Sequence, residues 1–276
     1  MEIIKAALYG LVQGFTEFLP ISSSGHLAIL KNILGLDFFG DAILFMLILH
    51  LGSLGAVFIM YFKDIQNIII GFITLIVKIF TGKFKYKNLT SEERFAILIF
   101  IATVPLVIGA LIDKKIEVLA DYTKLVGLFL IINAVVLFLS DRIPDGKLTE
   151  KTASPKNAVF IGICQLIAVA PGISRSGSTI TGGLLSGFNR TFAVKFSFIM
   201  SIPAILGASV FKFIDFAGSS EPVNATMVFS CIVGLAFAFV SGIVAIVVLN
   251  MIARKKNFSI FGVYCLIAGI LALIFG

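Results

Sequence analysis

Long runs of apolar residues, separated by short polar or charged clusters, set the pattern of this chain. A helix needs about 20 apolar residues to cross roughly 30 Å of hydrocarbon. The pattern predicts six membrane-spanning helices: Ala42–Phe62, Phe95–Ile112, Leu125–Ser140, Phe196–Phe211, Ala225–Met251 and Asn257–Gly276. The third and fourth of these are short, and each would be lengthened by extending past a flanking lysine that snorkels to the interface.

Two further apolar regions are interrupted before they are long enough to span. Ala6–Thr16 runs into Glu17 and Pro20, and Asn157–Ala170 runs into Pro171-Gly172. A second short apolar segment follows each interruption. Irregular backbone at membrane depth is tolerated only where protein or a water-filled cavity satisfies its polar groups. We therefore expect each region to form a re-entrant helical hairpin.

The two interrupted regions resemble each other. Gly10–His26 aligns with Gly162–Ser178 with only a small shift, and the spans that follow end in the similar triplets Tyr61-Phe62-Lys63 and Val210-Phe211-Lys212. Each half then holds one hairpin and three spans, and an odd number of spans forces the second half to enter the membrane upside down. The expected fold is an all-α integral membrane protein, one domain over residues 1–276, with inverted repeat halves of about 1–145 and 155–276.

Composition excludes most other protein classes. Of the 276 residues 59% are hydrophobic and 13% are charged, and the mean hydropathy is +1.08. Soluble chains carry about 25% charged residues and about 45–50% apolar ones. This composition excludes disorder, a coiled coil and nucleic-acid binding. The net charge of +7 lies in short clusters between apolar runs, which is typical of the loops of a membrane protein. The chain is predicted to be a polytopic membrane protein.

Charge in the loops predicts the orientation. The loops on one side hold thirteen Lys and Arg residues, and those on the other side hold Lys114, Lys115, Lys124 and Lys212. The basic side should be cytoplasmic. Both termini then face outside, the first hairpin enters from outside and the second from the cytoplasm. The short, lysine-flanked segment Ile65–Ile79 is expected to lie along the cytoplasmic surface as an amphipathic helix.

Ionisable residues inside membrane segments cost about 2.5–3.5 kcal/mol each at a helix centre, so each is a candidate for function. Three candidates, Glu17, His26 and Arg175, fall at or just after the two breaks. More peripheral ones are His50, for which we favour a structural role, and Arg190 and Lys195, which we expect to be snorkelling interface anchors.

The first break brings a carboxylate, hydroxyls and an imidazole together. Gln13 and Glu17 are four residues apart and share a helix face. Pro20 ends that helix, and Ser22 to Ser24 are natural caps for the next one. His26 lies one turn beyond Ser22 on the same face.

The second break resembles an anion site. Ser174, Arg175, Ser176 and Thr179 open the helix that follows Pro171-Gly172. Helix N-termini offer free N–H groups and a positive dipole end, and the arginine fork matches phosphate oxygens. The two breaks together predict a substrate that is a phosphate ester or anhydride with an apolar tail.

Structural explanations compete with these roles. Serines at breaks often only cap helix ends, and Arg175 could bind backbone carbonyls or Glu17. His26 could be a packing residue, and so could Gln13. These alternatives stay open at the level of the sequence.

At these residues the sequence resembles the undecaprenyl-diphosphate phosphatase family, also called the bacitracin-resistance proteins. The first family motif is Gln13-Gly-Phe-Thr-Glu17 followed by Pro20-Ile-Ser-Ser-Ser-Gly-His26. The second is Pro171-Gly-Ile-Ser-Arg-Ser-Gly-Ser-Thr179. The resemblance covers the whole chain, and two long motifs in order are a specific signal.

The resemblance implies a membrane hydrolase acting on a phosphoric anhydride. It would convert undecaprenyl diphosphate to undecaprenyl phosphate, recycle the lipid carrier for peptidoglycan synthesis and confer bacitracin resistance. It implies catalytic roles for Glu17, His26, Ser22, Ser23 and Arg175, and phosphate binding by Ser174, Arg175, Ser176 and Thr179. Glu17 and Gln13 would bind a divalent cation, Mg²⁺ or Ca²⁺. Some family members have Glu where this chain has Gln13. The neutral amide halves the charge of the two metal-binding side chains and so weakens the metal interpretation.

Several alternatives stay open. The nucleophile is Ser23 or Ser22, with Glu17 or His26 as its base, or it is His26 itself. The family implies a multi-pass protein of the bacterial cell membrane whose site opens to the outer face and whose partners are a polyprenyl diphosphate lipid and the bilayer, with a homodimer left open. A lipid-phosphate flippase is the alternative function, since inverted repeats with broken helices are common in transporters.

Overall fold

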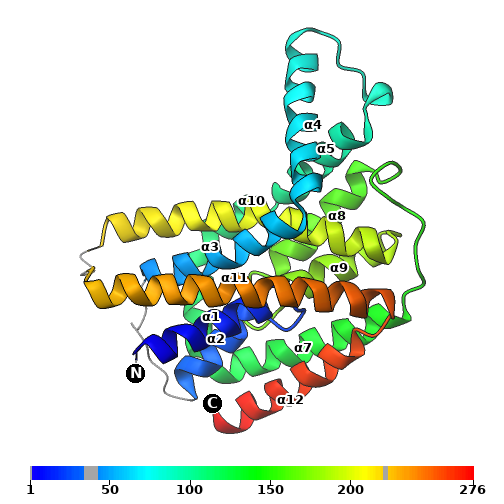
Figure 1. Cartoon of the computed structure of the whole chain (residues 1–276). Helices are drawn as coiled ribbons and strands as arrows, with labels where there is room; N and C mark the ends of the chain where they lie inside the picture. Colours follow the sequence, from blue (N-terminus) through cyan, green and yellow to red (C-terminus); the bar gives the residue numbers. More distant parts are fainter. Residues whose placement is uncertain (1, 34–42, 220–222) are drawn as a thin grey trace.

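A computed structural model describes residues 2–33, 43–219 and 223–276, and the described part is a bundle of helices (Figure 1). Five helical segments of the described residues are, by length and composition, long and apolar enough to cross a membrane. They are α3 (Ile43–Met60), α5 with α6 (Ser91–Thr103 and Leu106–Glu117), α7 (Thr123–Arg142), α10 (Arg190–Ala217) and α11 (Ala225–Arg254). Ala42, the expected start of the first span, lies outside the described residues.

The predicted spans agree with these helices in place but not always in length. α7 and α10 continue past the lysines that flank the two short runs, Lys124 in α7 and Lys195 in α10. The span predicted at Phe95–Ile112 bends at Pro105, between α5 and α6, because proline cannot donate a helix hydrogen bond. The sixth predicted span corresponds to α12 (Ser259–Phe275), an apolar helix of 17 residues.

Both interrupted regions form helix, break and helix. In the first, α1 (Glu2–Phe18) and α2 (Ser23–Asn32) are joined at Leu19–Ser22, and in the second, α8 (Pro155–Ile167) and α9 (Arg175–Leu185) are joined at Ala168–Ser174. Each second helix has the same kind of cap: the Ser22 hydroxyl accepts from the Gly25 N–H, and that of Ser174 accepts from the Gly177 N–H. The similarity seen in the sequence is therefore also a similarity of local structure.

The helices pair in a regular way. α1 packs along α11 and α8 packs on α5, while α3 lies against α10 and α7 against α12. Glycines allow the closest of these approaches: a Cβ on Gly14 of α1 would lie 2.8 Å from the backbone nitrogen of Gly242 in α11. Such small-residue contacts let membrane helices pack closely, and here they hold the helix that carries Glu17.

The two termini lie at the same end of the bundle, and the loops around 143–154 and 255–257 lie at the other end (Figure 1). There the Asp141 carboxylate accepts hydrogen bonds from the backbone N–H groups of Phe258 and Ser259 and so caps α12. α4 (Phe62–Phe80), which covers the predicted segment Ile65–Ile79, projects away from the bundle.

The prediction that Arg190 is a snorkelling anchor is wrong. Its side chain is buried, and Nη2 donates to the carbonyl oxygens of Ser140 and Ile143 at 3.2 and 3.0 Å. Those carbonyls lie at the C-terminal end of α7, which is the negative end of its dipole, and a buried cation is therefore favourable there. Lys195 pairs with Asp64 at 3.2 Å and with Glu150 at 3.7 Å and lies over the Phe95 ring, so it joins α10 to α4 and to the loop before α8. Its expected role as an interface anchor stays a prediction.

Candidate active site

The two breaks meet in the interior of the bundle. The Ser176 hydroxyl donates to the carbonyl oxygen of Leu19 at 3.3 Å, across from one hairpin to the other. A Cβ on Gly25 would lie 3.1 Å from the Cα of Gly172, and one on Gly177 would lie 3.3 Å from the Cβ of Pro20. The glycines at both tips therefore let the hairpins touch.

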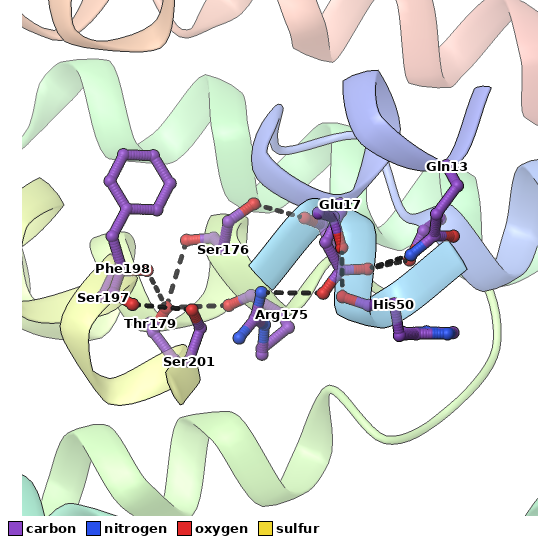
Figure 2. Close-up of polar contacts among 12 residues, drawn as sticks. Gln13, Glu17, His50, Arg175, Ser176, Thr179, Ser197, Phe198 and Ser201 are labelled. Carbon is purple, nitrogen blue, oxygen red and sulfur yellow. Dashed lines mark hydrogen bonds and ion pairs between the residues drawn. The ribbon is translucent and has the colours of Figure 1, made fainter. Parts of the chain in front are cut away.

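Glu17 is the centre of the polar network at this junction. It is buried, and its Oε1 pairs with Nη2 of Arg175 at 2.9 Å. Its Oε2 accepts from Nε2 of Gln13 at 3.0 Å and from the Ser23 hydroxyl at 2.9 Å. Figure 2 shows Arg175 and Gln13 on opposite sides of the Glu17 carboxylate. Two buried charges are tolerated when they pair and their remaining valences are filled.

Two atoms of this network have no partner among the described residues. Nη1 of Arg175 and Oε1 of Gln13 are both buried without a hydrogen bond. Buried polar groups are nearly always satisfied, so each such exception calls for an explanation. Both atoms belong to residues that bond the Glu17 carboxylate.

A small cavity of about 60 Å³ opens between the breaks. Glu17, Ser22, Ser23 and Ser24 contribute to its wall from the first hairpin, and Ser174 and Arg175 from the second. The polar part of the wall consists of hydroxyls, one carboxylate, one guanidinium and the beginnings of two helices, where N–H groups favour an anion, and Ala168 and Ile173 supply an apolar part.

The caps and the remaining serines have structural contacts of their own. The hydroxyls of Ser22 and Ser24 lie 3.3 Å apart, and those of Ser174 and Ser176 lie 3.1 Å apart. The buried Thr179 hydroxyl donates to the Arg175 carbonyl and lies 2.6 Å from the Ser197 hydroxyl, so it fixes α9 on α10 (Figure 2). Thr179 and Ser176 thus support the helix that carries Arg175.

The His26 ring makes its hydrogen bonds outside the Glu17–Arg175 network, to Ser22 and to Tyr264. Its Nδ1 lies 2.7 Å from the Ser22 carbonyl oxygen and its Nε2 lies 2.8 Å from the Tyr264 hydroxyl. The two rings are stacked, with centroids 5.4 Å apart and planes 8° from parallel. Because a carbonyl only accepts, Nδ1 carries the proton and Nε2 of the neutral ring accepts from the phenol. The sequence did not single out Tyr264, which is 238 positions away in α12.

Asn133 is a second residue that sequence reasoning missed. It is fully buried in α7 and bonds the backbone of both breaks, at Pro20 and at Ser174. An amide in a mostly apolar span is a detectable signal, since polar groups in membrane helices are costly. His50, by contrast, bonds through Nδ1 to the carbonyl of Met46 in its own helix at 2.8 Å.

The chain matches the family described as "Bacitracin resistance protein BacA" over residues 6–271. It is 40% identical to the undecaprenyl-diphosphatase of Methanosphaera stadtmanae over 99% of this chain and 98% of that protein. It is 39% identical to the undecaprenyl-diphosphatase of Alkaliphilus metalliredigens, over 100% and 99% of the two chains, and 39% identical to that of Methanobrevibacter smithii, over 98% and 96%. These names give the transporter alternative no support. An all-helical, multi-pass membrane chain with both sequence motifs and this end-to-end similarity belongs to the BacA family.

Proposed function

We propose that this protein hydrolyses undecaprenyl diphosphate to undecaprenyl phosphate and inorganic phosphate. One observation carries the proposal: Glu17 and Ser23 of one hairpin meet Arg175 of the other inside an apolar helical bundle. The family and the names of the relatives give the lipid. The product would return to peptidoglycan synthesis as the lipid carrier, and removal of the diphosphate form would confer resistance to bacitracin.

Arg175 is the phosphate-binding residue in this proposal. Its fork matches two phosphate oxygens, and it follows the Ser174 cap at the start of α9, where the N–H groups and the helix dipole favour an anion. Nη1 has no partner among the described residues. Charge stabilisation at the transferred phosphoryl group is the main requirement of such catalysis, and Arg175 supplies it.

Ser23 is the proposed nucleophile. Its hydroxyl already donates to Glu17 at 2.9 Å, so the carboxylate can take the proton as the oxygen attacks the terminal phosphorus. Undecaprenyl phosphate leaves and takes that proton from Glu17. Water then attacks the phosphoserine: Glu17 accepts a proton from the water and returns it to the Ser23 oxygen as inorganic phosphate is released. The alternatives are less well placed, because the Ser22 hydroxyl caps α2 and both ring nitrogens of His26 are engaged.

A divalent cation, Mg²⁺ or Ca²⁺, is a further part of the proposal. Among the described residues there is no cluster of three or more His, Cys, Asp and Glu for a metal. Glu17 and the unpartnered Oε1 of Gln13 would hold the ion together with substrate phosphates, as Mg²⁺ sites commonly use. The ion would neutralise negative charge on the diphosphate.

We also propose the finer architecture of six crossings and two re-entrant hairpins in an inverted repeat. The pairing of helices supports it: exchanging the halves turns the α1–α11 contact into the α8–α5 contact and leaves the α3–α10 and α7–α12 contacts unchanged. α12, with 17 residues, is at the lower limit for a crossing. α4 would lie on the cytoplasmic surface.

The orientation follows from charge. The basic loops around 143–154 and 255–257 gather at the end opposite the termini (Figure 1). The positive-inside tendency puts that end in the cytoplasm and both termini outside. The carrier cycle releases the diphosphate on the outer face, so we propose that the site opens there.

Phosphate release from undecaprenyl diphosphate by the purified protein in detergent tests this function. We expect one inorganic phosphate per lipid, with activity in Mg²⁺ or Ca²⁺ and loss in a chelator. A flippase would need two compartments and would release none. Absence of phosphate release by folded protein in every ion would contradict the proposed hydrolysis, whereas release that survives the chelator would contradict only the metal.

A further inference from the structure

Asn133 bonds the backbone of both hairpins at once. Its Nδ2 donates to the carbonyl oxygen of Pro20 at 2.8 Å, and its Oδ1 accepts from the N–H of Ser174 at 3.2 Å. Nδ2 also lies 3.4 Å from the Cys265 sulfur of α12. The side chain is 0% exposed, so all of its contacts are with protein.

The two backbone groups are next to the candidate chemistry. Pro20 follows the end of α1, three residues after Glu17 and three before Ser23. Ser174 is the cap of α9, and Arg175 is the first residue of that helix. Chain breaks leave such carbonyl and N–H groups without helical partners. A neutral amide satisfies both, because it donates and accepts through adjacent atoms.

We propose that Asn133 is a positioning residue that sets the distance between the Glu17–Ser23 side and the Arg175 side of the active site. This inference rests on the proposed function. α7 supplies a rigid support for both tips. The direct side-chain bonds between the tips, among the described residues, are the Glu17–Arg175 ion pair at 2.9 Å, which a bound phosphate would open, and the longer bond from Ser176 to the Leu19 carbonyl at 3.3 Å. A displacement of about 1 Å at a reacting centre can cost about a hundredfold in rate.

The leucine variant N133L keeps the volume of the side chain and removes both bonds. Arg175 would still bind phosphate but would no longer be held in line with Ser23. We expect kcat per folded protein to fall about 30-fold or more while KM changes less than about threefold. The matched control is N250L, since Asn250 of α11 bonds the Tyr61 hydroxyl at 3.1 Å away from the junction. Its kcat should stay within about threefold of wild type.

The aspartate variant N133D gives a readout that a merely structural role would not move. An ionised carboxylate cannot donate to the Pro20 carbonyl, whereas the protonated acid donates to Pro20 and accepts from Ser174 as the amide does. Glu17 and Arg175 are the charged groups of the same junction in both proteins, and Cys265 of α12 and His26 of α2 are its other titratable groups. We expect the ratio of N133D to wild-type kcat to rise at least about tenfold as the pH falls from 8 to 6. A ratio independent of pH, or wild-type kcat in N133L, would overturn the inference.

A third arm does not depend on activity. Cysteines at Pro20 and Gly177, with the three native cysteines replaced, probe the contact between the tips, where the Cβ distance is 3.3 Å. Disulfide formation under a mild oxidant should slow about tenfold or more when N133L is added and should not slow when N250L is added. An unchanged rate in N133L would overturn the inference even if the protein hydrolysed no diphosphate, so the two failures are distinguishable.

Discussion

The carboxylate of Glu17 and the guanidinium of Arg175 are 2.9 Å apart although they are 158 positions apart in the chain. Each alone would be an uncompensated charge in an apolar bundle, which is strongly destabilising. Paired, they join the two hairpins and hold two groups of opposite charge beside the Ser23 hydroxyl. In the proposed mechanism, a phosphate that binds Arg175 would take the place of the carboxylate, and Glu17 would then be free to act as a base.

Replacing Arg175 with lysine tests the fork. R175K keeps the positive charge and loses bidentate recognition, so kcat/KM should fall about 10²- to 10³-fold. R94K is the control, because the guanidinium of Arg94 lies over the Tyr86 ring and neither residue belongs to a hairpin. Phosphate release measured on both variants decides the matter, and an R175K rate within threefold of wild type would remove bidentate binding from the account.

The S23A variant tests the nucleophile. Without the hydroxyl that donates to Glu17, phosphate release should fall about 10³-fold or more. The control S53A removes another buried hydroxyl, one whose bond is to the His50 carbonyl of its own helix, and should keep its rate within about threefold. A phosphoenzyme trapped by acid quench should appear in wild type. Its persistence in S23A would transfer the role to Ser22 or His26.

The Y264F variant tests the outer contact of His26. The stacked ring stays and the hydrogen bond to Nε2 is lost, a neutral bond of about 1 kcal/mol, so kcat should fall only about fivefold. H26A also removes the bond to the Ser22 carbonyl and should cost about 10²-fold or more. If both variants were equally impaired in a kcat measurement, the phenol itself would be essential and our assignment of its role would be wrong.

The backbone at Ser22 stores strain that a stability measurement can detect. Its φ is 72°, a region that costs a non-glycine residue about 1–2 kcal/mol. Both S22G and S22A lose the hydroxyl that accepts from the Gly25 N–H, but glycine costs less than alanine at a cap and also relieves the strain, which S22A keeps. Unfolding in mixed micelles should therefore show S22G more stable than S22A by about 1 kcal/mol or more. Equal stability of the two variants would mean that the Ser22 backbone is relaxed.

Much of this fold is predictable from the sequence, because apolar run length and charge placement decide which segments can cross a membrane. The hairpins are predictable for the same reason, since Pro20 and Pro171-Gly172 interrupt runs too short to span. The ends of α7 and α10 are less predictable. Lys124 and Lys195 lie within these helices, so a charge does not mark a helix end.

The candidate site is predictable only in its local parts. Motif spacing indicates that Gln13 and Glu17 share a helix face and that Ser174 caps the helix of Arg175. It does not indicate that Asn133 holds both breaks or that Tyr264 stacks on His26, since those contacts join residues 113 and 238 positions apart. The assignment of Arg190 to the interface was wrong for a related reason: its buried guanidinium donates to the carbonyl oxygen of Ser140 in another helix, 50 positions away.

Contact between the two hairpin tips is the central claim, and disulfide trapping measures it most directly. In a background without the native cysteines, P20C and G177C place two thiols where the Cβ atoms are 3.3 Å apart, close to disulfide geometry. We expect rapid cross-linking, seen as two fragments that stay joined until reduced after protease cleavage at a site inserted in the 144–152 loop. The control pair P20C and G207C, whose second site has no neighbour within 4 Å among the described residues, should not cross-link. Fragments that separate freely in the first pair, as they do in the control, would contradict the joint site.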